Sequence, residues 1–186
     1  SRIARLTSEL LFFPPDLHMI IPELRAGVIG TGFIGPVHIE ALRRLGVNVV
    51  AIADVGDLAA KAADRLAIPR AFADYRAMLD CPEVDVVHIT APNRFHCEMA
   101  LAALRAGKHV VCEKPLAMNT RESARIVAAA RRAGRVFGVN YNVRFYPAVL
   151  ALRRMVASGE LGEIIHVNGS YFQDWLFKDT DYNWRL

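Results

Sequence analysis

Three glycines near the amino-terminal end of the chain have the spacing G-x-G-x-x-G. Gly30, Gly32 and Gly35 follow a short apolar run and precede a helix-like pattern, with Phe33 and Ile34 between the last two. In that context the first glycine permits a tight turn, the second lets the backbone approach a diphosphate, and the third lets the helix pack closely. Free amides and the positive end of the helix dipole then attract phosphate. The loop predicts a dinucleotide site rather than three glycines that only end a strand.

A carboxylate follows the next apolar run. Asp54 ends "AIAD", at about the 20-residue distance at which an acidic partner of such a loop is expected. A carboxylate accepts hydrogen bonds from ribose hydroxyls and repels a 2′-phosphate, so Asp54 favours NAD over NADP. Taken alone, Asp54 is equally explained as a turn or helix-capping residue.

The segment "CEKPL" places a lysine beside a glutamate after a strand-like run. Lys114 can supply a cation and a proton near a reacting alcohol carbon, and Glu113 can hold a ribose hydroxyl. Pro115 fixes the backbone that follows. The plainer explanation, a solvated Glu–Lys pair at the edge of a sheet, stays open on sequence logic alone.

Two further segments carry polar residues directly after strand-like runs. In "APNRFH", Pro92, Asn93 and His96 lie where open α/β sheets bind ligands, although Asn93 is also a helix cap and His96 an ordinary structural histidine by type. In "NYNVRFYP", Arg144 suits either the cofactor and substrate side or a domain junction. These four residues complete the predicted cofactor-binding set.

Strand-like and helix-like segments alternate and predict an α/β fold with a doubly wound parallel sheet. Predicted strands cover residues 26–30, 47–54, 70–73, 84–90, 108–115 and 136–140. Predicted helices cover residues 36–45, 58–66, 93–106 and, from a capping-box-like start at Asn119, up to residue 133. In the first helix the apolar stripe of Val37, Ala41, Leu42 and Leu45 is expected to face the core.

The pattern changes after residue 141. We expect residues 1–22 to be an extension or an artefact, residues 23–141 to form the dinucleotide-binding domain, and residues 142–186 to begin a second α/β domain. In this last part we expect a helix over 147–158, a turn over 159–162 and a long strand over 163–175. A single strand of this kind has unpaired edges, so the second domain looks incomplete.

The composition is that of an ordinary globular chain. Of 186 residues, 53% are apolar and 23% charged, the net charge of +4 comes from scattered arginine pairs, and no apolar run approaches the ~18 residues of a membrane helix. These features argue against membrane insertion and nucleic-acid binding. Three widely spaced cysteines show no metal spacing and favour a reducing, cytoplasmic location. We therefore expect no bound metal.

Taken together, "GVIGTGFIGPVH", "TAPNRFHCEMALAALRAGKHVVCEKPLA", "NYNVRFYPAV" and "SGELGEIIHV" resemble the glucose–fructose oxidoreductase / inositol dehydrogenase / MocA family. The resemblance implies a Rossmann domain, a second domain with a large open sheet used for homo-oligomer contacts, and NAD(P)-dependent hydride transfer to or from a sugar, cyclitol or similar alcohol carbon. It assigns diphosphate to the glycine loop and the adenosine ribose to Asp54. It assigns the nicotinamide ribose to Asn93 and Glu113, and catalysis to Lys114.

One feature departs from the family pattern. Members contribute a D-x-x-x-H segment from the second domain to the acid/base site, and His166 and Asp174 do not fit it. Two alternatives to a dehydrogenase therefore stay open: a catalytically incomplete dinucleotide-binding or sensor module, and, less favoured, an NAD-using glycosidase.

Overall fold

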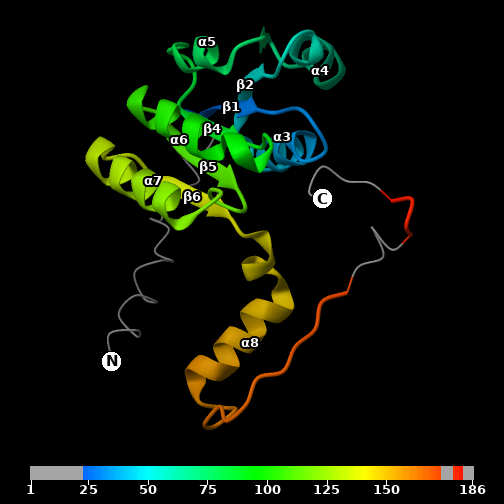
Figure 1. The fold of residues 1–186 in the computed structure, drawn as a ribbon, viewed down its shortest axis with the longest axis vertical. Helices are drawn as coiled ribbons and strands as arrows, with labels where there is room; N and C mark the ends of the chain where they lie inside the picture. The colour runs from blue at the N-terminus through cyan, green and yellow to red at the C-terminus, as the bar shows by residue number, and fades with distance from the viewer. Residues whose placement is uncertain (1–22, 173–177, 182–186) are drawn as a thin grey trace. The chain divides into compact units, whose positions relative to one another are not determined.

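A computed structural model describes residues 23–172 and 178–181 of the chain (Figure 1). Its contacts divide the chain after Tyr141 into two units, 1–141 and 142–186. The extension expected over residues 1–22 and the position of Asp174 lie outside the described residues. No helix in the described part is long and apolar enough to span a bilayer.

Unit 1 is built on a sheet of six parallel strands in the order β3-β2-β1-β4-β5-β6, which confirms the predicted doubly wound α/β fold. The order reverses between β1 and β4, and this switch point is where such sheets bind their ligands. The strands are β1 (Arg25–Ile29), β2 (Asn48–Ala53), β3 (Arg70–Phe72), β4 (Val86–Ile89), β5 (His109–Glu113) and β6 (Phe137–Asn140).

Helices cover the two faces of this sheet, each over its own apolar core (Figure 1). Residues alternate between the faces along each strand, so Val28 and Ile52 belong to one core and Ile29 and Ala53 to the other. The first core lies under α3 (Gly35–Arg44) and α4 (Leu58–Leu66). The second lies under α5 (Tyr75–Leu79), α6 (His96–Arg105) and α7 (Thr120–Ala133).

Two of these helices differ from the sequence-based expectation. Helix α5 was not predicted, because five residues are too few for a helical period to stand out; its one signal is Asp74, whose Oδ1 accepts the amide of Arg76 at 2.9 Å. The helix predicted over 93–106 begins instead with a 3₁₀ turn, η2 (Asn93–Phe95), and becomes α-helical at His96.

The start of α7 follows the predicted cap closely. Asn119 Oδ1 accepts the amide of Glu122 at 3.0 Å, and Gly134 ends the helix with φ of 59°. The reciprocal bond of a capping box is displaced by one residue, because Glu122 Oε2 accepts the amide of Met118 rather than that of Asn119. The sequence signal therefore located both helix ends.

Unit 2 contains η3 (Asn142–Phe145) and α8 (Pro147–Ser158), followed by a turn in which Gly162 N–H donates to Gly159 O at 2.9 Å. The helix and the turn are as predicted. The strand predicted over 163–175 is wrong for residues 163–172, which form no strand; residues 173–175 lie outside the described part. A strand is defined by hydrogen bonds to a neighbour, and alternating side chains in 163–172 do not supply one.

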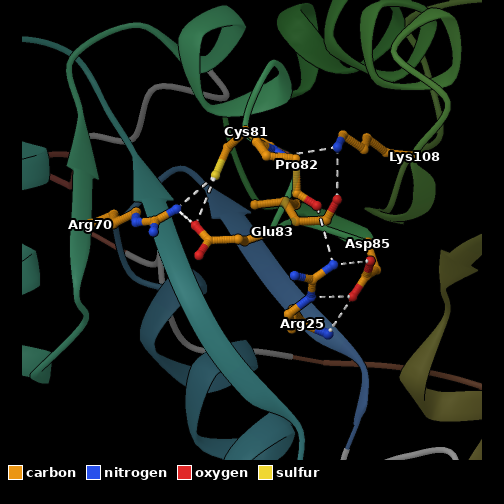
Figure 2. Close-up of polar contacts among 8 residues, drawn as sticks. Arg25, Arg70, Cys81, Pro82, Glu83, Asp85 and Lys108 are labelled. Carbon is orange, nitrogen blue, oxygen red and sulfur yellow. Dashed lines mark hydrogen bonds and ion pairs between the residues drawn. The ribbon is translucent and has the colours of Figure 1, made fainter.

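A set of polar contacts fastens the amino-terminal edge of the sheet in unit 1 (Figure 2). Asp85 accepts from the backbone amide, Nε and Nη2 of Arg25, at 3.0, 2.9 and 2.9 Å, and Arg25 Nη2 also donates to Pro82 O at 3.2 Å. These bonds hold the pKa of Asp85 below its usual 3.8, although partial burial opposes them. They join the start of β1 to the residue that precedes β4.

The loop of residues 81–85, which precedes β4, is also held by Lys108 and Arg70. Lys108 Nζ donates to the carbonyl oxygens of Cys81 and Val84, at 2.9 and 2.8 Å. Arg70 Nη1 contacts Cys81 Sγ at 3.1 Å and forms an ion pair with Glu83. All of these residues come from the amino-terminal ends of strands or from the loop before β4, so this edge has a structural role (Figure 2).

We expect Asp85→Asn to lower the urea midpoint of unfolding at pH 7, because the bidentate charged pairing with Arg25 is lost. A lowered carboxyl pKa adds stability above its unfolded-state value, and that stability disappears as the pH falls through the folded-state value. The difference between the two proteins should therefore shrink below about pH 4. Asp80→Asn, at an exposed position in the same region, is the control. Equal midpoints for Asp85→Asn and the unaltered chain at pH 7 would contradict this role.

Candidate functional site

The register of the parallel strands brings most of the predicted site residues to one edge of the sheet. Ile29 is level with Ala53 of β2 and with Ile89 of β4, and Glu113 is level with Asn140. The residues that end or follow these strands are therefore neighbours at the carboxyl edge. They are Gly30, Asp54, Pro92, Asn93, Glu113 and Lys114.

The glycine loop crosses this edge at the switch point. Gly30 has φ of 95°, and a Cβ added there would lie 2.7 Å from the amide nitrogen of Ala91. A Cβ added at Gly35 would lie 2.2 Å from Gly30 O. Both positions exclude any side chain, whereas an added Cβ at Gly32 would meet no atom within 4 Å. Packing thus requires Gly30 and Gly35, and Gly32 leaves open space beside bare backbone.

Helix α3 begins within this loop with its first amides free of side-chain partners. Ile34 occupies the N-cap, makes no side-chain capping bond, and no acidic residue lies in the first turn. Phe33 is 91% exposed. Uncapped amides at a helix N-terminus next to a side-chain-free loop fit a diphosphate group, which would supply the missing acceptors.

Asp54 connects the end of β2 to the same loop. Its Oδ2 accepts hydrogen bonds from the backbone amide and the hydroxyl of Thr31, each at 2.6 Å, and its Oδ1 accepts the amide of Val55 at 2.8 Å. It does not cap α4, whose N-cap is Asp57. The carboxylate therefore lies against the glycine loop.

The segment after β4 lies beside the loop. Thr90 Oγ1 donates to Gly30 O at 2.7 Å and lies 3.0 Å from Ile29 O, joining the two strand ends. Pro92 is exposed and Asn93 half-buried at the start of η2. Neither η2 nor α6 has a side-chain capping bond, so the amide of Asn93 is not used as a cap.

His96 is fully buried below this turn. Its Nε2 lies 2.8 Å from Ala91 O and its Nδ1 2.7 Å from Pro115 O. A neutral imidazole donates from one nitrogen only, so both contacts are hydrogen bonds only when the ring carries two protons. The ring lies between the segment after β4 and the segment after β5, the latter containing a cis peptide between Lys114 and Pro115.

Glu113 belongs to a buried polar cluster that the sequence did not reveal. Its Oε1 accepts from His38 Nε2 at 3.0 Å and from Asn140 Nδ2 at 2.5 Å, and its Oε2 accepts the amide of Lys114 at 3.2 Å. His38 Nδ1 lies 2.9 Å from Nδ1 of His88. Four side chains from α3, β4, β5 and β6 are thereby joined.

Two groups in this cluster have shifted pKa values. Burial alone would raise the pKa of Glu113, but hydrogen bonds from His38 and Asn140 and the charge of His38 outweigh it, and the pKa lies below its usual 4.5. Burial lowers the pKa of His88 to about 4, and repulsion from His38 adds to the effect. At neutral pH Glu113 is therefore a carboxylate and His88 a neutral ring.

The remaining predicted residues lie in more open surroundings. Lys114 directly follows Glu113 and is exposed at the carboxyl edge, as a group that meets a ligand would be. Arg144 lies in η3 of unit 2 and is exposed. His166, also in unit 2, is exposed. Among the residues described in both units, no group of three His, Cys, Asp or Glu side chains is placed to hold a metal.

The prediction that Val37, Ala41, Leu42 and Leu45 face the core is confirmed for Leu42 and wrong for the other three, which are exposed. Val37 and Leu45 are 50% and 64% exposed, and the buried residues are Gly35, His38, Ile39 and Leu42. The apolar pattern alone did not include His38, because histidine is polar. The signal that would have found the buried face is the helical spacing from Gly35, which must face the strand: His38, Ile39 and Leu42 follow it by three, four and seven residues.

Residues 24–141 match the profile of an oxidoreductase family with an NAD-binding Rossmann fold, Gfo/Idh/MocA. The chain is 37% identical over 164 residues to levoglucosan dehydrogenase of Pseudarthrobacter phenanthrenivorans, covering 82% of this chain and 42% of the relative. It is 36% identical over 154 residues to inositol 2-dehydrogenase of Salmonella typhimurium, covering 80% and 46%.

A solved structure of levoglucosan dehydrogenase in complex with NADH is similar to this chain, with a TM-score of 0.71 and 36% identity. The similarity covers 75% of this chain and 40% of that one. The chain thus spans less than half the length of these two curated relatives.

We expect the His88 ring to titrate with a midpoint of about 4 instead of 6.5, as measured by NMR of its ring protons. Because the unfolded chain binds this proton at higher pH, stability is full above pH 6.5 and falls toward pH 4. Between pH 6.5 and pH 4 the free energy of unfolding of the unaltered chain, measured with urea, should therefore fall by about 3 kcal/mol more than that of His88→Leu. His166→Leu, at an exposed site, should leave the loss unchanged. A ring midpoint near 6.5 would contradict the burial argument.

Proposed function

Because the chain belongs to the Gfo/Idh/MocA family of NAD-binding oxidoreductases, we propose that it binds NAD(H) at the carboxyl edge of its sheet and acts in hydride transfer to or from the CH–OH carbon of a sugar, cyclitol or related polyol. The observation that carries this proposal is the glycine loop, where two positions exclude side chains and the third leaves bare backbone beside open space.

The residues around the loop fit a dinucleotide. The free amides at the start of α3 would bind the diphosphate, with Phe33 and Ile34 in the turn beside it. The carboxylate of Asp54 would accept the hydroxyls of the adenosine ribose after giving up part of its bonding to Thr31. A 2′-phosphate placed there would meet a negative charge, so the proposed cofactor is NAD rather than NADP.

The opposite half of the site would hold the nicotinamide end. Asn93, which caps no helix, and Glu113, which is ionised, would bind the second ribose. Pro92 and His96 would shape this side, and Arg144 completes the proposed cofactor-binding set. When bound, NAD accepts or returns a hydride at its nicotinamide ring.

Lys114 is the residue we propose to act on the substrate. Its ammonium group would hydrogen-bond to the alcohol or carbonyl oxygen and exchange a proton with it as the hydride moves. The relatives named above act on levoglucosan and on inositol, both of which carry several CH–OH groups, and this supports a polyol-like substrate.

The remaining part of the proposal concerns the role of residues 142–186 and the location of the protein in the cell. Residues 142–186 would begin a second α/β domain with a large open sheet that completes the substrate pocket and joins subunits. Many of the apolar side chains of this segment are exposed, among them Phe145, Leu152, Ile165 and Tyr171, and such a sheet would cover them. The three free, buried cysteines suit the reducing conditions of the cytoplasm.

The cofactor assignment is tested by titrating the chain with NADH and NADPH and following nicotinamide fluorescence. Because hydrogen bonds to a charged group contribute about 1.5–3 kcal/mol, Asp54→Ala should weaken NADH binding about tenfold or more. NADPH binding should be weaker in the unaltered chain and should change less. Asp57→Ala, three residues further on and exposed, is the matched control. A preference for NADPH, or no response to millimolar NADH, would refute the assignment.

The role of Lys114 is tested in a chimera that joins residues 24–172 to the portion of levoglucosan dehydrogenase that this chain does not cover. Loss of a general acid/base should lower kcat by about 100- to 10,000-fold in Lys114→Ala, with NADH affinity changed by less than about threefold. Lys61→Ala, on the exposed side of α4, should keep full turnover. Turnover that survives Lys114→Ala would show that another group moves the proton. Tight NADH binding without any polyol oxidation would favour a binding module.

A further inference from the structure

His38 lies one helical turn after the glycine loop, and its ring contacts Glu113, in the half of the site proposed for the nicotinamide end. It is 7% exposed, and both ring nitrogens have partners, Nε2 with Glu113 at 3.0 Å and Nδ1 with His88 at 2.9 Å. A buried polar ring is costly unless its hydrogen bonds are made, so this position is specified rather than incidental. The ring connects α3, which begins at the proposed diphosphate site, to the last residue of β5.

The acceptor at the centre of the cluster fixes the proton positions. A carboxylate only accepts, so each group that meets Glu113 must donate: His38 Nε2, Asn140 Nδ2 and the amide of Lys114. The short distance between Asn140 Nδ2 and His38 Nε2, 3.2 Å, follows from their sharing one acceptor oxygen. With the Nε2 proton directed at Glu113, the other ring nitrogen of His38, Nδ1, meets Nδ1 of His88 at 2.9 Å.

These bonds decide both the charge and the orientation of Glu113. Burial by itself favours the protonated acid, and the donors from His38 and Asn140 reverse that preference. Oε1 is held by the two side chains and Oε2 by the amide of Lys114, so rotation of the carboxylate is blocked at both oxygens. The backbone of Lys114 is tied to the same group.

We infer that His38 is a positioning residue of the proposed site: through its Nε2–H it holds Glu113 ionised and correctly turned for the nicotinamide ribose, and it thereby links the diphosphate-binding helix to the segment that carries Lys114. The inference rests on the proposed function, because Glu113 has this task only if the dinucleotide binds as proposed. His38 itself does not contact the cofactor.

The groups that influence Glu113 come from three neighbouring elements and its own strand. They are His38 from α3, His88 from β4 one contact further away, Asn140 from β6, and Cys112 and Lys114 on either side. The pKa of Cys112 is raised to about 12, by burial first and by the charge of Glu113 second, so the thiol is neutral. Within residues 23–172 and 178–181, only His38 and Asn140 place a side-chain donor on the carboxylate.

The experiment compares His38→Leu, which removes the donor, with His38→Gln, whose amide can replace it. In glutamate-labelled protein without cofactor, carbon NMR should show the Glu113 carboxyl titrating about one pH unit or more higher in His38→Leu than in the unaltered chain. His38→Gln should restore most of the original value. His109→Leu, at the opposite end of β5, should have no effect. An unchanged Glu113 titration in folded His38→Leu would overturn the inference.

The same variants are then titrated with NADH at pH 5.5 and pH 8. His38→Leu should lose about twofold or more additional affinity at pH 5.5 compared with pH 8, since partial protonation of Glu113 removes one good acceptor. The unaltered chain and His38→Gln should show little of this additional loss. Equal pH dependence in all three proteins would overturn the link to the cofactor site, whereas a general packing defect would weaken binding equally at both pH values.

A measurement on the unaltered chain keeps the test independent of how the variants fold. Nitrogen NMR of the histidine rings should show a proton on Nε2 of His38, and a ring protonated only at Nδ1 would overturn the inference. If the carboxyl titration shifts as expected but the unaltered chain does not bind NADH, the proposed function fails while the His38–Glu113 relation stands. If NADH binds and the titration does not shift, only the role of His38 fails.

Discussion

The close approach of β1, α3 and β4 at Gly30 and Gly35 governs the arrangement of the whole edge. A methyl group at Gly35 would overlap the carbonyl oxygen of Gly30, and one at Gly30 would overlap the backbone after β4. Because no side chain separates the helix from the strand ends, the first amides of α3 are bare. For the same reason the helix lies near enough for His38 to reach β4 and β5 one turn later.

The cluster around Glu113 is a consequence of this closeness. A carboxylate at the end of a central strand would be driven toward its neutral form by burial, and the polar groups of α3 and β6 prevent it. His88, further from the edge, is neutral at neutral pH because burial, and after it repulsion from His38, lowers its pKa. The cluster therefore places a negative charge at the edge of the sheet and keeps the ring of His88 behind it uncharged.

Much of this architecture could be predicted from local patterns. The apolar runs, the glycine spacing and the capping residues of α7 each report on a few neighbouring residues, and the order of strands and helices follows from them. The cluster could not be predicted, because His38, His88, Glu113 and Asn140 meet only through the register of three strands. The strand expected over 163–175 failed in residues 163–172 for a related reason, since an alternating pattern does not provide a pairing partner.

The polar contacts at the amino-terminal edge of the sheet have a structural role instead. Arg25, Asp85, Lys108 and the loop of residues 81–85 hold the strands together without help from any group at the ligand edge (Figure 2). The amino-terminal border thus keeps the strands together independently of the border proposed to bind the cofactor. Substitutions at the proposed binding border can then alter recognition while this fastening stays intact.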